Sequence, residues 1–444
     1  ERCPDFAEHV FAISAVSGGS IGASLFNAAL SEKSKGKDVS RVGGAPAGCI
    51  EPASHGELFE RLREVTRDDY LSPVLAYILP DIVRNIRELL AGPAIRKEPC
   101  KNEARFEWFG RDQILEKSFI ASFSRSKKPD GGFAAVCPGA ADAGMLMRNF
   151  SDTWTPGAKL PAPLLNATWV ETGYRVAFSP FPLRHLGEGT LYSFGDVGEL
   201  PGIGHEAGRS WQDPSLIGAA VVSARFPFLM PPWATNPNSK NRWTFVDGGY
   251  ADSSGVTTGL ELYLELKRQW ASAPELKRLA GANGKEIRSD QIKFYLISLT
   301  DAYAEPDYRK IAGGSLGDFI SPINTMLTVR ELLAMRAVTN AYAQLGGKMI
   351  TIQLDQQTFP LPLGWKISAL SSDIVRFTMG RPANCDPARE RDLDWAAWTV
   401  NHNSCELKNI TALLTPPPAP RAPPPPAAAP PPVQSPGSWL PLPR

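Results

Sequence analysis

The stretch that decides the fold lies near the start of the chain and reads His9-Val10-Phe11-Ala12-Ile13-Ser14-Ala15-Val16-Ser17-Gly18-Gly19-Ser20-Ile21-Gly22-Ala23-Ser24-Leu25-Phe26. An apolar run rich in Val, Ile and Phe is typical of a buried strand. It ends in a G-x-S-x-G pentapeptide at residues 18–22, and residues 21–30 favour a helix. A strand, a tight glycine turn that holds a serine, and a helix together indicate a nucleophile elbow. We therefore predict that Ser20 is a nucleophile.

The residues around Ser20 suit both a sharp turn and an oxyanion hole. Glycines there avoid clashes between Cβ atoms and the adjoining strand and helix, and the helix start offers free N–H groups to a developing negative charge. We assign these turn and oxyanion positions to Gly18, Gly19, Ile21 and Gly22, with a donor expected from the Ile21 backbone N–H. The same pattern recurs at residues 313–317, but no strand precedes it, so Ser315 is expected in a loop or helix cap.

Composition narrows the class of protein. The chain has 444 residues and a formal net charge of +1, which gives no reason to expect a nucleic-acid partner. Its six cysteines lack C-x-x-C spacing, so neither a metal site nor a redox motif is expected, and buried thiols are favoured over disulfides. No apolar run is long enough to cross a bilayer, which leaves a membrane-associated or cytoplasmic chain.

The hydrophobic pattern predicts strands that alternate with helices, and hence an α/β layered fold. Helices are expected at residues 56–66, 68–90, 111–124, 214–223, 256–270, 323–345 and 395–400, and further strands at residues 164–170, 174–178, 191–194, 243–246, 292–299 and 348–354. We assign residues 1–414 to one hydrolase domain, with a helical insertion or lid at residues 50–150. Residues 415–444 hold fourteen of the 41 prolines and are expected to be an extended, disordered tail, with an SH3-like partner as a minor alternative.

A serine nucleophile needs a base, and none of the five histidines lies in a convincing catalytic context. His402 alone follows both Ser20 and a candidate aspartate, the chain order of α/β-hydrolase triads, although a surface position is the simpler interpretation. Asp247 follows an apolar strand and precedes Gly248 and Gly249, so its carboxylate is expected at a strand end. Asp130, in a similar Asp-Gly-Gly sequence, follows a polar segment and indicates a plain turn.

In their order and spacing, these residues resemble the patatin-like phospholipases, and within them the bacterial, membrane-associated branch. The resemblance covers roughly residues 10–370. It rests on the elbow at residues 18–22, on Ser223-Ala224-Arg225-Phe226-Pro227, on Phe245-Val246-Asp247-Gly248-Gly249-Tyr250, and on Asp252-Ser253-Ser254-Gly255, with Leu71-Ser72-Pro73 and Pro362-Leu363-Gly364-Trp365 as secondary features.

The resemblance implies a three-layer fold with a central, mostly parallel sheet flanked by helices. It implies hydrolysis of lipid acyl esters through an acyl-enzyme, with Ser20 as nucleophile, Asp247 as general base, and no metal or cofactor. The partners would be a lipid or phospholipid substrate and a membrane surface. The helices at residues 56–90 and the loop at residues 226–233 are candidates for the acyl-binding wall.

Two alternatives remain open, a Ser20/Asp247/His402 triad and a non-catalytic lipid-binding scaffold. The resemblance also implies a glycine-rich oxyanion loop upstream of the elbow. Because the chain opens at Glu1, almost directly on the elbow strand, we expect an upstream strand and this loop to be missing. On that expectation, the 444 residues alone would be nearly inactive.

Overall fold

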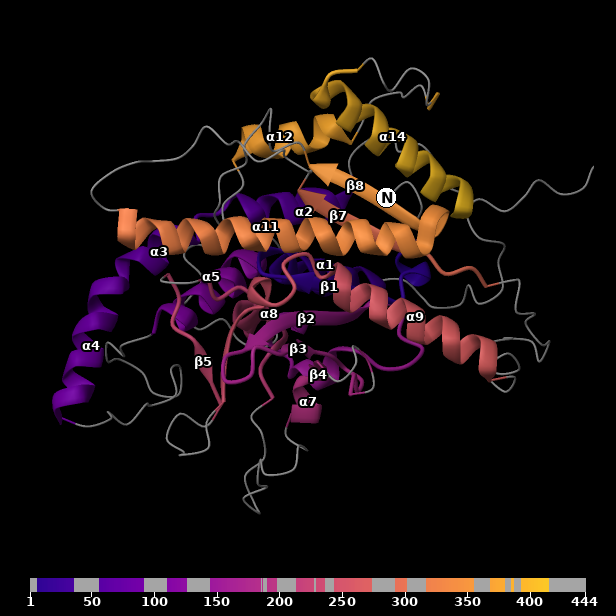
Figure 1. Ribbon diagram of the computed structural model, residues 1–444. Helices are drawn as coiled ribbons and strands as arrows, with labels where there is room; N and C mark the ends of the chain where they lie inside the picture. Colours follow the sequence, from indigo (N-terminus) through magenta and orange to yellow (C-terminus); the bar gives the residue numbers. More distant parts are fainter. Residues whose placement is uncertain are drawn as a thin grey trace, which may run out of the picture.

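The computed structural model describes residues 6–35, 56–91, 110–125, 144–184, 186, 190–197, 213–226, 229–235, 243–273, 292–301, 317–354, 368–379, 385–386 and 393–414 (Figure 1). Several predictions lie outside these residues. They concern Ser315, Asp130, the Pro-rich tail at residues 415–444, and the histidines at positions 55, 185 and 205.

The larger sheet has six strands. They are β1 (Ala12–Val16), β2 (Ala162–Trp169), β3 (Arg175–Phe178), β4 (Leu191–Ser193), β5 (Trp233–Ala234) and β6 (Thr244–Asp247). Strand β2 lies between β6 and β3, and it also pairs with β1. The pairs β1–β2 and β3–β4 are parallel, whereas β2–β3, β2–β6 and β5–β6 are antiparallel.

The sheet is therefore mixed, and the prediction of a mostly parallel sheet is wrong for it. The short connection at residues 170–174 explains part of the difference, because a link of a few residues can only return the chain antiparallel to the strand it leaves. A second, two-stranded sheet pairs β7 (Leu296–Asp301) with β8 (Met349–Leu354) in parallel. The long helix α11 (Gly317–Leu345) lies between these two strands in sequence, as a parallel crossover requires.

The other helices overlap predicted ones, except for those at residues 194–197 and 369–378, where no helix was predicted. They are α1 (Gly18–Lys35), α2 (Glu57–Arg67), α3 (Leu71–Ala76), α4 (Ile78–Ala91), α5 (Arg111–Arg125), α7 (Phe194–Val197), α8 (Leu216–Ser223), α9 (Val256–Ser272), α12 (Ala369–Thr378) and α14 (Trp395–Leu414). Short 3₁₀ turns are η1 (Phe6–His9), η2 (Gly144–Met147), η3 (Phe150–Thr153), η5 (Gly248–Tyr250) and η6 (Gly346–Lys348).

Helices pack on both faces of the larger sheet because successive side chains of β2 point to opposite sides. Leu165 and Ala167 belong to the main core, which is built with α1, α5 and α8. Leu164 faces the other way and packs near Leu262 of α9. Helix α9 also packs against α11 and Met349 of β8, so it joins the two sheets.

Several predicted helices have different limits in the structure. Helix α1 extends beyond the expected residues 21–30 at both ends, and α11 begins before the expected residue 323. The helix expected at residues 68–90 is divided at Tyr77 into α3 and α4, and the helix expected to stop at residue 400 continues to Leu414. A disulfide bond joins Cys385 to Cys405 of α14, where free thiols were favoured. The other four cysteines lie outside the described residues.

A buried charged cluster fixes α5 to the C-terminal end of α8. The Arg225 side chain is almost fully buried and donates to the Asp112 carboxylate at 2.9 Å and to the Pro231 carbonyl at 2.6 Å. Burial, reinforced by the neighbouring Asp112 charge, raises the pKa of Glu116 to about 7. Glu116 therefore takes up a proton in the folded protein at a pH where the unfolded chain is ionised.

The Glu116→Gln variant should be more stable than the parent protein at pH 8, by about 1–3 kcal/mol, and equally stable near pH 4. The pKa of Glu116 is 4.5 in the unfolded chain and about 7 in the folded protein. Between these values the folded protein binds a proton that the unfolded chain has lost. The free energy of unfolding therefore falls as the pH rises through that window. Urea denaturation at the two pH values measures the difference. Exposed Glu64 provides the control Glu64→Gln. An equal gain at both pH values would contradict the assignment.

Candidate active site

Strand β2 brings the end of β1 and the end of β6 to the same part of the sheet. Val16 of β1 is paired with Asn166 of β2, and the next β2 residue, Ala167, is paired with Asp247 of β6. Both strands lie on the edge of β2 opposite β3, because β2 residues 165–166 pair with both β1 and β3 and residues 167–168 pair with both β3 and β6. The carboxyl ends of β1 and β6 therefore meet end to end on this edge. Ser17, which follows Val16 directly, lies at this junction with Asp247.

Ser17 forms the sharp turn between β1 and α1. Its φ of 53° lies in the left-handed region, and it is the one non-glycine residue with positive φ in the described part of the chain. Such a conformation costs a non-glycine residue on the order of 1–3 kcal/mol and tends to occur where function requires it. The strained turn between β1 and α1 therefore falls at Ser17, three residues before Ser20.

Ser20 lies inside the first turn of α1 and is completely buried. Its Oγ is 2.7 Å from the Oγ of Ser223, at the end of α8. The Ser223 hydroxyl donates its one proton to the Asn166 carbonyl and accepts from the Ser17 backbone N–H. Ser20 must therefore be the donor to Ser223, and its proton is directed at a neutral hydroxyl group. No described hydrogen bond joins Ser20 to Asp247.

The Asp247 carboxylate is buried and unequally satisfied. Oδ1 accepts from the Gly249 backbone N–H at 2.7 Å and from Arg330 at 3.2 Å. Oδ2 makes no hydrogen bond of normal geometry with any described residue. Burial raises the pKa of Asp247, and the Arg330 charge, the Gly249 N–H and the Ser17 side chain lower it in part. Ser17 is therefore the hydroxyl that faces this carboxylate, and Oδ2 has the capacity to accept its proton.

The two glycines after Asp247 permit close approaches that other residues would block. A Cβ atom on Gly248 would lie 2.2 Å from the Asn166 carbonyl oxygen, which belongs to the backbone of β2. A Cβ atom on Gly249 would lie 2.0 Å from the Arg330 guanidinium. Gly248 thus sets the distance between β6 and β2, and Gly249 makes room for a cation beside Asp247.

The start of α1 supplies free backbone donors next to Ser17. The N–H groups of Gly18 and Gly19 make no hydrogen bond with another described residue, and both glycines are exposed. The Ile21 N–H, predicted as an oxyanion donor, bonds to the Ser17 carbonyl, and the Ile21 side chain is buried in the core. Gly22 lies in α1 with open space at its Cβ position. Gly18 and Gly19 are therefore the better placed donors.

Arg330 comes from the middle of α11 and contacts Asp247 across 83 residues of sequence. Its guanidinium also lies 5.9 Å from the ring centres of Phe226 and Tyr250. The Ser253 hydroxyl donates to the Arg330 carbonyl, which holds this turn of α11 against the loop after Asp247. One cation and two aromatic rings thus border the carboxylate on the side of Oδ1.

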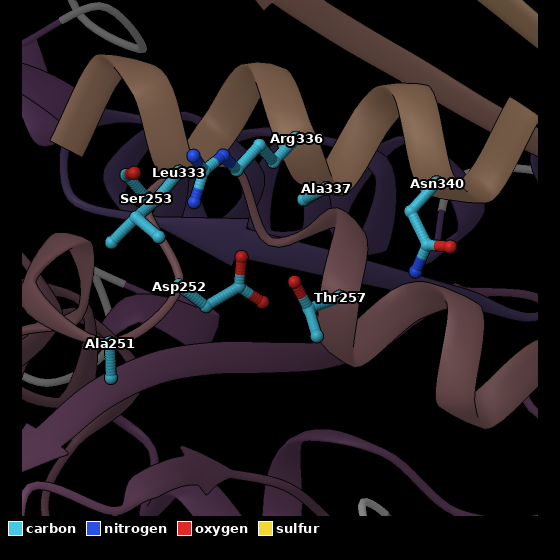
Figure 2. Close-up of a pocket in the computed structure, with 8 residues that line it drawn as sticks. All are labelled: Ala251, Asp252, Ser253, Thr257, Leu333, Arg336, Ala337 and Asn340. Carbon is cyan, nitrogen blue, oxygen red and sulfur yellow. The ribbon is translucent and has the colours of Figure 1, made fainter. Parts of the chain in front are cut away.

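A cavity of about 350 Å³ lies one to two turns further along α11, between this helix and the start of α9 (Figure 2). Asp252 projects toward it, but both of its carboxylate oxygens are occupied. Oδ1 accepts from the Gly255 N–H, and Oδ2 accepts from the backbone and side chain of Thr258. Asp252 therefore caps α9, and both of its carboxylate oxygens are used in doing so.

His402 lies apart from this site, on α14. Its Nε2 is 3.0 Å from both the hydroxyl and the carbonyl oxygen of Thr351 on β8, and its ring stacks on Trp398. The described contacts of His402 thus support a structural role and give no support to the triad. Across the described residues, no group of three or more His, Cys, Asp or Glu side chains is placed to hold a metal ion.

Asp247 was expected at this site from the sequence, whereas Ser17 and Arg330, which lie beside it in the structure, were not. A signal for Ser17 was present, because it directly follows the strand and has small residues two positions before and after it, Ala15 and Gly19. The exact glycine pattern drew attention to Ser20 instead. No comparable signal marks Arg330, since α11 is distant in sequence and its contact with Asp247 depends on the tertiary fold.

The Gly248→Ala variant should lose about 3 kcal/mol of stability, because the new methyl group meets the rigid backbone of β2. Gly249→Ala should lose less, since the atoms it meets are the mobile end of Arg330. Gly22→Ala is the matched control, with open space at the Cβ position and a helical backbone that favours alanine. Thermal unfolding of the three variants measures the order. Equal melting temperatures for Gly248→Ala and Gly22→Ala would contradict it.

Comparison with known proteins adds no assignment to this geometry. The chain matches no protein-family model and no curated protein. The function of the protein is therefore inferred from the residues and contacts of the site itself.

Proposed function

We propose that the protein is a serine hydrolase of acyl esters in which Ser17 is the nucleophile and Asp247 the general base. The observation that supports this most is the combination of a strained, left-handed Ser17 with a buried carboxylate that interacts with its side chain and whose Oδ2 has no other hydrogen-bond partner among the described residues. The nucleophile moves from Ser20 to Ser17, since the Ser20 proton is engaged with Ser223. The role expected for Asp247 is unchanged.

The proposed reaction has two halves. Ser17 Oγ attacks the ester carbonyl carbon while its proton passes to Asp247 Oδ2. The oxyanion is stabilised by the free Gly18 and Gly19 N–H groups and by the positive end of α1. The intermediate collapses, the C–O bond of the ester breaks, and the leaving alcohol takes the proton from Asp247. A water molecule then repeats the sequence on the acyl-enzyme and regenerates Ser17.

Burial gives Asp247 the properties that this mechanism requires. An aspartate in water, with a pKa near 3.9, is a poor base for a serine hydroxyl. Desolvation by the surrounding protein raises the pKa of Asp247, and so strengthens it as a base. The order of elements, with helices on both faces of the larger sheet, is compatible with a patatin-like fold. On the basis of this likeness, we propose lipid or phospholipid acyl esters as the substrates.

Ser17→Ala should lower kcat on a soluble short-chain ester by at least about 10³-fold in the full-length protein, whereas Ser20→Ala should lower it by less than about tenfold. The first variant removes the attacking atom, and the second removes one neutral hydrogen bond worth about 1 kcal/mol. Ester hydrolysis and labelling by a fluorophosphonate probe measure the two effects together.

Asp247→Asn should resemble Ser17→Ala, because the amide cannot accept the proton. His402→Ala should keep its activity and serves as the control for the triad. Loss of activity in Ser20→Ala with retention in Ser17→Ala would reverse the assignment. A parent protein that the probe does not label would favour the scaffold alternative.

Helix α4 offers a surface for contact with aggregated lipid. Its apolar residues recur at helical spacing and are strongly exposed, with Leu79 at 72%, Leu89 at 85% and Leu90 at 81%. On the opposite side Asp81 is buried and paired with Arg111, which also donates to the Leu229 carbonyl in the loop before β5. The helix projects from the body of the molecule (Figure 1). An amphipathic helix of this kind is suited to lie in a lipid interface.

We propose that α4 holds the protein at a membrane surface. No helix in the described residues is long and apolar enough to span a bilayer. Contact through its exposed apolar face is the kind of association that α4 can provide, while Arg111 connects the opposite, buried side of the helix to the loop at Leu229.

The double variant Leu79→Ser, Leu89→Ser should weaken binding to phospholipid vesicles by about tenfold or more, because it removes two exposed apolar side chains from the interface. Vesicle co-sedimentation measures binding, and hydrolysis of a soluble ester should stay unchanged. A matched pair, Leu332→Ser and Leu333→Ser on α11, controls for general loss of exposed apolar surface. Unchanged vesicle binding in the α4 variant would refute this role.

A further inference from the structure

Arg330 occupies a position that affects the base directly. It donates to Asp247 Oδ1 at 3.2 Å, close to the limit of a hydrogen bond, and it lowers the pKa of this carboxyl. A cation beside a general base stabilises the ionised form and so weakens the base. In the structure as it stands, Arg330 therefore opposes the effect of burial on Asp247.

The way in which Arg330 is held allows its contact with Asp247 Oδ1 to be exchanged for another. Its backbone is fixed by Ser253, but its side chain is 15% exposed and makes one hydrogen bond among the described residues. The rings of Phe226 and Tyr250 border the guanidinium without hydrogen-bonding to it. The remaining N–H groups are thus available to a second acceptor that enters from the solvent side.

A phosphate or similar dianionic group matches the unused donors of Arg330 better than one shared carboxylate oxygen does. A guanidinium presents five N–H groups in a planar fork, and it binds phosphate oxygens in pairs. Asp247 Oδ1 would keep its hydrogen bond from the Gly249 N–H after Arg330 moved. The carboxylate would then stay in place but lose the cation that weakens it.

We propose that Arg330 binds a phosphate group carried by the ester substrate and leaves Asp247 Oδ1 when it does so. This inference rests on the proposed hydrolase function. It makes Arg330 a specificity-determining residue that favours acyl esters with a phosphate a few bonds from the ester carbonyl. It also couples substrate binding to activation of the base, because the base is released by the substrates that the site selects.

The kinetic test uses two esters that differ only in the phosphate, a monoacylglycerol and the corresponding monoacylglycerol phosphate. The parent full-length protein should prefer the phosphate ester. Arg330→Gln should lower kcat/KM for the phosphate ester by about 10- to 100-fold, the value of one charged hydrogen bond. It should raise kcat/KM for the uncharged ester, because the base loses the cation that weakens it. Arg330→Lys should retain part of the preference, since a lysine keeps the charge but loses the fork.

Arg336→Gln is the matched control, because Arg336 is an exposed arginine on the same helix. It should leave the ratio of the two substrates unchanged. An equal loss on both esters in Arg330→Gln would overturn the inference, and so would a preference for the phosphate ester that survives this change. Melting temperatures of the variants establish that each is folded.

A binding test separates this inference from the proposed function. Ser17→Ala protein, with or without Arg330→Gln, is titrated with dodecyl phosphate and with uncharged dodecyl maltoside. Arg330→Gln should weaken dodecyl phosphate binding about tenfold or more and leave the maltoside unaffected; equal weakening of both, or of neither, would overturn the inference. If inorganic phosphate competes with dodecyl phosphate, the site binds phosphate in general. If it does not compete, the site requires a phosphate carried by a lipid. If Ser17→Ala still hydrolyses esters, the proposed function fails while this test still applies to Arg330.

Discussion

The buried carboxylate of Asp247 is the constraint on which the site depends. A charge removed from water is costly unless nearby groups compensate it, and here the Gly249 N–H and Arg330 compensate one oxygen atom only. The other oxygen has no normal hydrogen bond with a described residue, and the Ser17 side chain acts on the same carboxyl. A carboxylate with both oxygens hydrogen-bonded would be more stable in its ionised form and would be a weaker base.

Strand β2 holds the other parts of the site relative to this carboxylate. Asn166 pairs with Val16, its side-chain amide donates to the Ala15 carbonyl, and its own carbonyl receives the Ser223 proton. The next residue, Ala167, pairs with Asp247. One strand thus sets the position of the serine turn, of the Ser20–Ser223 pair and of the Asp247 carboxylate. The tight packing of Gly248 on this same strand leaves little freedom in the distance between them.

Much of the fold was predictable because local patterns carry it. The apolar runs at β2, β6, α5 and α9 gave elements within a few residues of those observed, and the carboxylate at the end of β6 was predicted from its strand and its glycines. The direction of the strands could not be predicted, because strand pairing depends on which surfaces meet after folding. The contact between Arg330 and Asp247 could not be predicted for the same reason. Ser17 is a different case, because an exact motif three residues away drew attention from the residue at the strand end.

The most direct test of the central claim is a crystal structure of the full-length protein after reaction with a phosphonate that mimics the tetrahedral intermediate. We predict a covalent bond from phosphorus to Ser17 Oγ, with Asp247 Oδ2 within hydrogen-bond distance of that oxygen and Ser20 still paired with Ser223. Phosphorus bound to Ser20, or to Ser17 with Asp247 turned away from it, would contradict the account.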